Sequence, residues 1–237
     1  MLELRCEWGE QGIAALHHTS DVVIVVDVLS FCTTVDIAVS RGAAIFPYGA
    51  ADEPLEEYAH RRRAQVAEKV RVSSGGYSLS PSSLVGIKAG ERLVLPSPNG
   101  GSLSLLTGRA ITFAGCLRNR TAVAQAAQAA GASIAVIPAG ERWRDGSLRP
   151  AVEDWLGAGA ILAAFDRSLR GCARAAGGSL GGMSLRARID RTRLRKGCGT
   201  RSATRRERDG ALPAGWRIPY INRSLREQSV HASEIGE

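Results

Sequence analysis

Acidic side chains stand at two places in this sequence that are suited to metal or phosphoryl chemistry. The first is Asp27, which lies in the continuous apolar run DVVIVVDV at 21–28. A carboxylate at the end of a buried parallel strand is well placed to bind a metal ion or to attack phosphorus. It is equally suited to accepting hydrogen bonds from backbone amides, and its position alone leaves both interpretations open.

The second place is the loop AGERWRDGSLRPAVED at 139–154. Its carboxylates, Glu141, Glu153 and Asp154 among them, are hard oxygen ligands of the kind that Mg²⁺ prefers. Arg142 could clamp a phosphate or a sulfonate. The alternative is that Glu153 and Asp154 occupy the first turn of a helix, where each acid interacts with the helix dipole by about 0.3–1 kcal/mol. Spacing alone favours this alternative.

Polar residues follow two of the apolar runs and are candidates for binding an anion. They are Ser30, Thr33, Thr34, Ser97, Asn99 and Gly100. The glycines of SPNGGS at 97–102 allow close backbone approach, and its amides could form an anion-binding concavity. An ordinary turn has the same composition. Cys32, in the first of these loops, is a candidate nucleophile, but a buried structural thiol is the favoured interpretation.

Segments typical of strands and of helices alternate along residues 1–166. Apolar runs typical of strands occupy 21–28, 43–48, 92–97, 110–115 and 133–140, and helical patterns occupy about 30–42, 52–66, 119–130 and 152–163. This alternation predicts an α/β fold, a mostly parallel sheet with helices on both faces. Such sheets bind ligands beyond the carboxyl ends of their strands, so we expect Asp27 and the polar loops to meet there.

The charge balance changes near residue 166. Residues 1–166 carry 15 Lys and Arg against 17 Asp and Glu, whereas residues 167–237 carry 16 against 6. The second segment is rich in Arg, Gly and Ser and has no sustained apolar period, which predicts an irregular, poorly ordered tail. It is either a natural basic extension or a segment read out of register. Its charge also suits non-specific nucleic-acid binding, but no recognised motif accompanies it, so nucleic acid is the less favoured partner.

The remaining composition indicates a cytoplasmic protein with no membrane partner. No apolar run reaches the roughly 18 residues of a membrane span, and MLELRCEWGE lacks the blocks of a secretory signal. The five cysteines include no CxxC pair, so reduced thiols are expected. A homo-oligomer is compatible with all of this.

Five blocks, in order, resemble the 2-phosphosulfolactate phosphatase family over about residues 10–165. They are VVDVLSFCTTVDIAVSRGA, LSPSSL, LVLPSPNGGSLS, FAGCLRNRTAVA and VIPAGERWRDGSLRPAVEDWLGAGAIL. The resemblance implies a phosphatase that uses Mg²⁺ as its cofactor. Its substrate would be a small, highly anionic phosphate ester of a 2-hydroxy acid, as in coenzyme M biosynthesis.

The resemblance also marks individual positions. Those that match the family pattern are Asp27, Asn99, Gly100, Asn119, Gly140, Glu153 and Asp154. From this set and its neighbours, we assign catalysis to Asp27 and Glu141. We assign Mg²⁺ binding to Asp27, Glu153 and Asp154, and substrate binding to Asn119, Arg142 and the six polar residues above.

Two departures from the family pattern stand out. The family commonly has arginine where Ser30 stands, so one expected anion contact is missing. The family's C-terminal portion also has no visible counterpart after residue 166. An inactive family member is therefore a further alternative.

Overall fold

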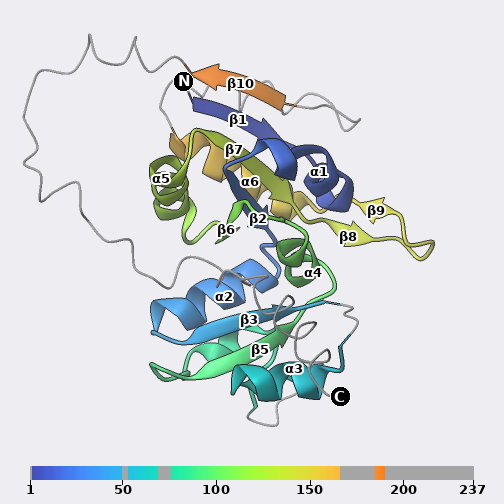
Figure 1. Ribbon diagram of the computed structural model, residues 1–237, viewed down its shortest axis with the longest axis vertical. Coiled ribbons are helices and arrows are strands. Elements are labelled where there is room, and N and C mark those ends of the chain that lie inside the picture. Colours follow the sequence, from blue (N-terminus) through green and yellow to red (C-terminus); the bar gives the residue numbers. More distant parts are fainter. Residues whose placement is uncertain (1, 50–52, 69–75, 166–184, 190–237) are drawn as a thin grey trace, which may run out of the picture.

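Two sheets and a hairpin organise the residues that the computed structural model describes, 2–49, 53–68, 76–165 and 185–189 (Figure 1). The first sheet has the order β10-β1-β7-β2-β6, with β1 Leu2–Cys6, β2 Val22–Val26, β6 Ile111–Gly115, β7 Ser133–Pro138 and β10 Leu185–Ile189. The second has the order β3-β5-β4, with β3 Ala44–Tyr48, β4 Gln65–Val66 and β5 Arg92–Pro96. The hairpin consists of β8 Glu141–Arg142 and β9 Leu148–Arg149.

Helices connect most of these strands. They are α1 Gly9–Leu16, α2 Phe31–Ser40, α3 Leu55–Arg62, α4 Gly100–Leu105, α5 Arg120–Ala130 and α6 Val152–Phe165, with single 3₁₀ turns at His17–Thr19 and Pro81–Leu84. α5 and α6 lie together on one side of the five-stranded sheet (Figure 1).

β2 lies between β6 and β7 in the five-stranded sheet, and all five of its residues are buried. A strand covered on both faces needs apolar side chains in both directions, which the run VVIVV supplies. Val23 and Val25 pack with α1 and α2 on one face, and Ile24 packs with α5 and α6 on the other. The predicted α/β fold with helices on both faces is confirmed.

The predicted strands divide between two sheets, which alternation along the chain does not reveal. β3 pairs in parallel with β5, and Phe46, Tyr58 and Val94 give this small sheet a core of its own. The prediction that a helix extends to Val66 is wrong. α3 stops at Arg62 because Arg63 takes a left-handed backbone conformation with φ of 48°, and Val66 then lies in β4.

β10 is the part of the basic tail that the structure describes. It pairs antiparallel with β1 along all five residues. The other tail residues lie outside the described residues, so the boundary near 166, the expected disorder and the nucleic-acid hypothesis stay predictions. Among the described helices, none is long and apolar enough to cross a membrane.

Candidate active site

Asp27 follows β2 directly and is buried, with 6% of its surface exposed. Both of its carboxylate oxygens accept backbone hydrogen bonds. The Phe31 amide, at the start of α2, donates to Oδ1 at 3.0 Å, and the Gly100 amide, at the start of α4, donates to Oδ2 at 2.9 Å. The hydrogen-bonding interpretation of Asp27 is therefore realised, and it joins the carboxyl end of β2 to the loop that follows β5.

The contact between Asp27 and position 100 requires glycine. A Cβ atom at Gly100 would lie 2.7 Å from Oδ2 of Asp27 and 2.7 Å from Cδ1 of Phe31. No larger residue fits between these groups without displacing them. Because the Gly100 amide already donates to Asp27, it is not free to hold a phosphate in this conformation.

Asp154, in the first turn of α6, repeats this bonding pattern. The Val28 amide donates to its Oδ1 at 2.8 Å and the Gly140 amide donates to its Oδ2 at 2.9 Å. The side chain is 4% exposed. Its carboxylate therefore points into the protein and connects the loops that follow β2 and β7. An exposed acid that interacted only with the helix dipole would not make these bonds.

Four carboxylates, those of Asp27, Glu141, Glu153 and Asp154, surround this junction. Burial raises the pKa of Asp27, its two amide donors lower it, and the charges of Glu141 and Glu153 raise it further. Burial, opposed by the two amides and reinforced by the charge of Asp27, raises the pKa of Asp154 to about 7. Among the described residues, none of the four forms an ion pair with a basic side chain. The negative charge of the junction is therefore not balanced by basic side chains among the described residues.

A pocket of about 490 Å³ opens beside these acids, between α1, α4 and the β8–β9 hairpin. Asn99 and Glu141 lie on its wall, where Nδ2 of Asn99 donates a hydrogen bond of 2.9 Å to Oε2 of Glu141. Trp8, Leu103 and Leu148 add apolar surface. Sequence reasoning did not single out Trp8 or Leu103, since each is an ordinary apolar residue at its place in the chain.

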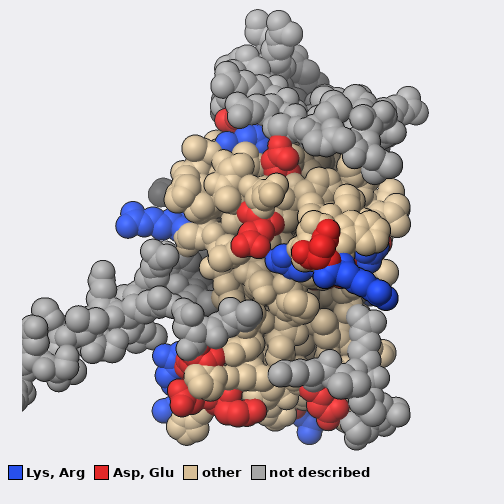
Figure 2. Space-filling view, turned by 90° about the vertical axis from the view of Figure 1, so that its right-hand side faces the viewer, with Lys and Arg blue, Asp and Glu red and all other residues tan. Residues whose placement is uncertain are grey.

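Arg142 lies at this pocket and is exposed. Its guanidinium donates to Oε2 of Glu10 at 3.2 Å and to the carbonyl of Gly146 at 3.2 Å. Figure 2 views the side from which the hairpin projects, and basic and acidic side chains lie next to each other there. An anionic ligand that bound Arg142 would have to replace or accompany the carboxylate of Glu10.

Three predicted substrate-binding side chains instead donate hydrogen bonds to backbone carbonyls. Ser30 and Thr34 donate to the carbonyl of Leu79 at 2.6 and 3.0 Å, and Thr33 donates to that of Val28 at 2.7 Å. These bonds attach α2 to its neighbouring loops. None of the three is among the described residues that line the pocket.

Asn119 and Ser97 are also buried within the loops they shape. Asn119 accepts from the Cys116 amide at 2.8 Å and donates to the Ala114 carbonyl at 3.0 Å, which fixes the turn before α5. The carbonyl of Ser97 accepts from both the amide and the hydroxyl of Ser102, each at 3.1 Å. In this arrangement both residues hold loops in place.

Cys32 is fully buried in α2. Its thiol donates to the carbonyl of Val25 at 3.2 Å, and burial raises its pKa well above the ordinary range. A nucleophilic cysteine needs an accessible thiolate, so this geometry supports the structural interpretation.

The donor chemistry of the junction fits Mg²⁺, because hard carboxylate oxygens gather there without described cations to balance them. Within the described ranges, no group of three or more Asp, Glu, His or Cys side chains forms a ready-made metal cluster. Mg²⁺ is commonly held by one or two carboxylates together with waters and a substrate phosphate, so three are not required. The predicted ligands Asp27, Glu153 and Asp154 interact electrostatically at this junction, and their binding of Mg²⁺ stays a prediction.

Comparison with known proteins bears out the resemblance seen in the sequence. The family model described as 2-phosphosulpholactate phosphatase matches residues 11–179. A curated 2-phosphosulfolactate phosphatase from Methanothermobacter thermautotrophicus is 31% identical over 147 residues, which are 62% of this chain and 62% of that protein. The match therefore spans less than two thirds of the relative's length. Because the matched residues make up more than half of the chain and run from α1 through α6, the chain belongs to the 2-phosphosulpholactate phosphatase family.

Proposed function

We propose that this protein is a magnesium-dependent phosphatase that hydrolyses a small anionic phosphate monoester such as 2-phosphosulfolactate. The observation that carries the proposal is the Asn99–Glu141 hydrogen bond on the wall of the 490 Å³ pocket, beside the buried Asp27. Family membership supplies the reaction class. A cytoplasmic role in coenzyme M biosynthesis belongs to the same proposal.

Glu141 is the best-placed general base in this arrangement. It is half-buried, it lines the pocket, and its hydrogen bond from Asn99 fixes the direction of its carboxylate. In the proposed reaction, Glu141 takes a proton from a water molecule whose oxygen attacks phosphorus. The ester P–O bond breaks, the leaving oxygen is released as the alcohol once protonated, and inorganic phosphate is the second product.

Asp27 is less suited to be the nucleophile. Both of its oxygens already accept backbone hydrogen bonds, and it is not among the residues that line the pocket. Its carboxylate instead offers charge at a fixed position, together with Glu153 and Asp154. When bound there, Mg²⁺ would neutralise charge on the phosphate oxygens.

The lining of the pocket suits a short substrate that carries acidic groups besides its phosphate. Trp8, Leu103 and Leu148 would contact the carbon skeleton, while Arg142 would offer a planar pair of donors to a carboxylate or sulfonate. The proposal therefore favours substrates with a second acidic group over simple alkyl phosphates.

A phosphate-release assay tests the proposal with purified full-length protein. The substrates are 2-phosphosulfolactate, 2-phospholactate and ethyl phosphate, each assayed with Mg²⁺ and with EDTA. We expect release from the two phospho acids, loss of activity in EDTA and recovery with added Mg²⁺. Equal rates with all three substrates would contradict the role of Arg142, and full activity after chelation would contradict the role of the metal.

A further inference from the structure

A second, basic pocket lies on the three-stranded sheet, away from the candidate active site. It has a volume of about 470 Å³ and is lined by Ala59, His60, Arg63, Ala64, Gln65, Gly90 and Arg92. Arg92 begins β5, whereas the candidate active site follows the other end of that strand. Five strand residues, about 13 Å along the strand, thus separate the two ends.

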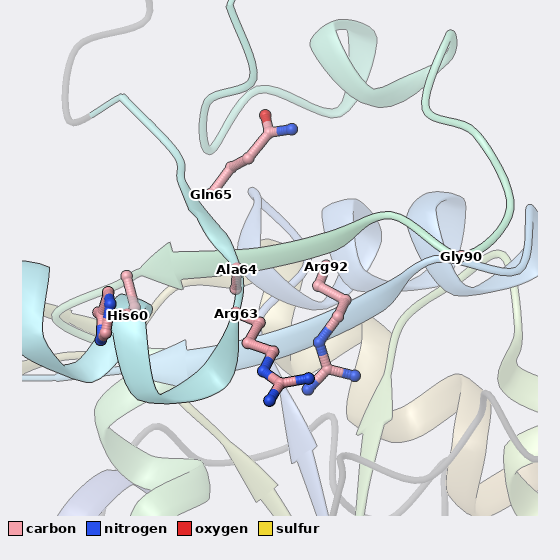
Figure 3. A pocket seen from close by; sticks show the side chains of 7 residues that line it. His60, Arg63, Ala64, Gln65, Gly90 and Arg92 are labelled. Carbon is pink, nitrogen blue, oxygen red and sulfur yellow. The ribbon is translucent and has the colours of Figure 1, made fainter.

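Arg63 and Arg92 point toward one another in this pocket (Figure 3). None of the described residues that line it is acidic, and neither arginine forms an ion pair within the described part of the chain. Glu91, the acid nearest in sequence to Arg92, interacts with Tyr77 instead. Two like charges therefore face one pocket without a described counter-charge, an arrangement that a bound anion would stabilise.

Arg92 is held in position for such a role. Its Nε donates to the carbonyl of Arg62 at 2.8 Å, and its guanidinium lies 4.7 Å from the centre of the Phe46 ring. Its two terminal nitrogens make no hydrogen bond or ion pair with the described residues, so little side-chain freedom would be lost when they bound a ligand.

Arg63 occupies a place where glycine is the usual residue. It caps the C-terminal end of α3 with φ of 48°, a left-handed conformation that is unfavourable for a residue with a side chain. One explanation is that its charge only complements the helix dipole. The dipole places roughly half a negative charge at this end, whereas the two guanidiniums carry two full positive charges. The pocket therefore keeps a net positive charge, which would attract an anion.

We propose that the Arg63–Arg92 pocket binds a doubly charged tetrahedral oxyanion, such as inorganic phosphate or the phosphate group of a small ester. Two guanidiniums from different elements can each present paired N–H donors to such an ion. This site is independent of the proposed phosphatase activity and of the residues assigned to it.

NMR titration of the ¹⁵N-labelled full-length protein tests this site directly. The reporters are the backbone amide of Gly90 and the Nε–H of Arg92, which its hydrogen bond to Arg62 protects from exchange. The Gly100 amide reports separately on the candidate active site. Inorganic phosphate and methyl phosphate are titrated at constant ionic strength, with chloride as the balancing anion.

We expect the Gly90 and Arg92 signals to shift and saturate with at least one of the two ligands. Arg63→Gln should weaken this binding about tenfold or more, because a charge-assisted contact is lost. Arg61→Gln is the matched control: it removes one positive charge two positions away, in the last turn of α3, but Arg61 pairs with Glu53 and does not line the pocket. If only inorganic phosphate saturates the signals, the ligand of the pocket is the free ion. If both compounds saturate them, the pocket recognises a phosphoryl group, whether free or esterified.

Two results would overturn the proposal. One is a chemical-shift change that grows without saturation for both ligands. The other is an equal loss of affinity in Arg63→Gln and Arg61→Gln. Either result would mean that the anions respond only to general surface charge. Arg63 makes no described side-chain hydrogen bond or ion pair, so its replacement is expected to leave the fold intact.

Discussion

The side-chain amide of Asn99 donates to the carboxylate of Glu141 at 2.9 Å, and this bond joins the two sheets at their carboxyl ends. Asn99 follows β5 of the three-stranded sheet, and Glu141 begins the hairpin that follows β7 of the five-stranded sheet. The candidate active site is therefore assembled between two sheets, so its geometry depends on how they sit against each other.

Glu141→Gln should lower kcat about 10²–10⁴-fold with little change in KM, because it removes the proposed base and keeps the shape of the side chain. Steady-state phosphate release measures this. Glu57→Gln, an exposed change on α3, is the matched control and should behave as wild type. Unchanged kcat in Glu141→Gln would remove Glu141 from the mechanism.

Asp27→Asn should reduce both activity and stability. The amide group has one oxygen where the carboxylate has two, so one of the Phe31 and Gly100 amides loses its acceptor while buried. An unsatisfied buried donor costs about 1–3 kcal/mol. Urea unfolding should show this loss, and kcat should fall at least about a hundredfold if Asp27 also supplies charge to the reaction. A variant with wild-type stability would show that the two backbone bonds matter little.

Stability of the metal-free protein should fall as pH rises through the range from about 4 to about 7. The pKa of Asp154 is about 7 in the folded protein against an ordinary value of 3.8, so the folded state holds its proton more tightly. The stabilisation is fully present below the lower value and is lost as pH rises to the upper one. The raised pKa of Asp27 acts in the same direction. Urea unfolding in EDTA between pH 4.5 and 8 measures the slope.

Asp154→Asn should flatten that slope, although it also lowers stability overall by removing an acceptor. Added Mg²⁺ should stabilise the wild-type protein more at pH 8 than at pH 5, because the carboxylates must be ionised to bind it. Identical slopes for the variant and the wild type would show that another group controls the pH dependence.

Two glycines of α6 should respond in opposite directions to alanine. A Cβ at Gly157 would lie 2.7 Å from Cγ2 of Val28 and 2.9 Å from Cγ1 of Val26, whereas nothing lies within 4 Å of one at Gly159. We expect Gly157→Ala to cost about 1–3 kcal/mol through overpacking. Gly159→Ala should stabilise by about 0.5–1 kcal/mol, since glycine disfavours a helix interior. Thermal unfolding of both variants checks this, and a shift of the same sign in both would contradict the packing argument.

The sequence predicted the fold class because its longest apolar runs are also its most buried strands. The run at 21–28 contains β2, and the alternation of such runs with helical patterns indicated parallel pairing. Shorter elements were not predicted. β4 and β8 have two residues each, too few for any periodicity, and β1 together with α1 occupies a stretch from which no element was inferred.

Part of the candidate site was also accessible from sequence. Asp27 could be picked out because it ends a buried run, and Asp154 because its loop is rich in acids. The long-range bonds they make were not accessible, since Gly100 is 73 positions from Asp27 and Val28 is 126 positions from Asp154, and these amides reach the carboxylates only in the folded chain. The residues that shape loops, such as Thr33 and Asn119, have the same side-chain types as residues that bind ligands, and only their surroundings separate the two uses.

The pairing of β10 with β1 has a consequence for any shortened version of the chain. Without β10, β1 would become the edge strand of its sheet and present a row of unpaired N–H and C=O groups. Such an edge is a template on which another chain can add a strand. A fragment ending at Phe165 would therefore be prone to aggregation through β1. An apparent molar mass from light scattering that rises with the concentration of the fragment, but stays constant for the full-length protein, would reveal it. On this view, one contribution of β10 is colloidal, in that it occupies the backbone groups through which β1 could otherwise recruit other copies.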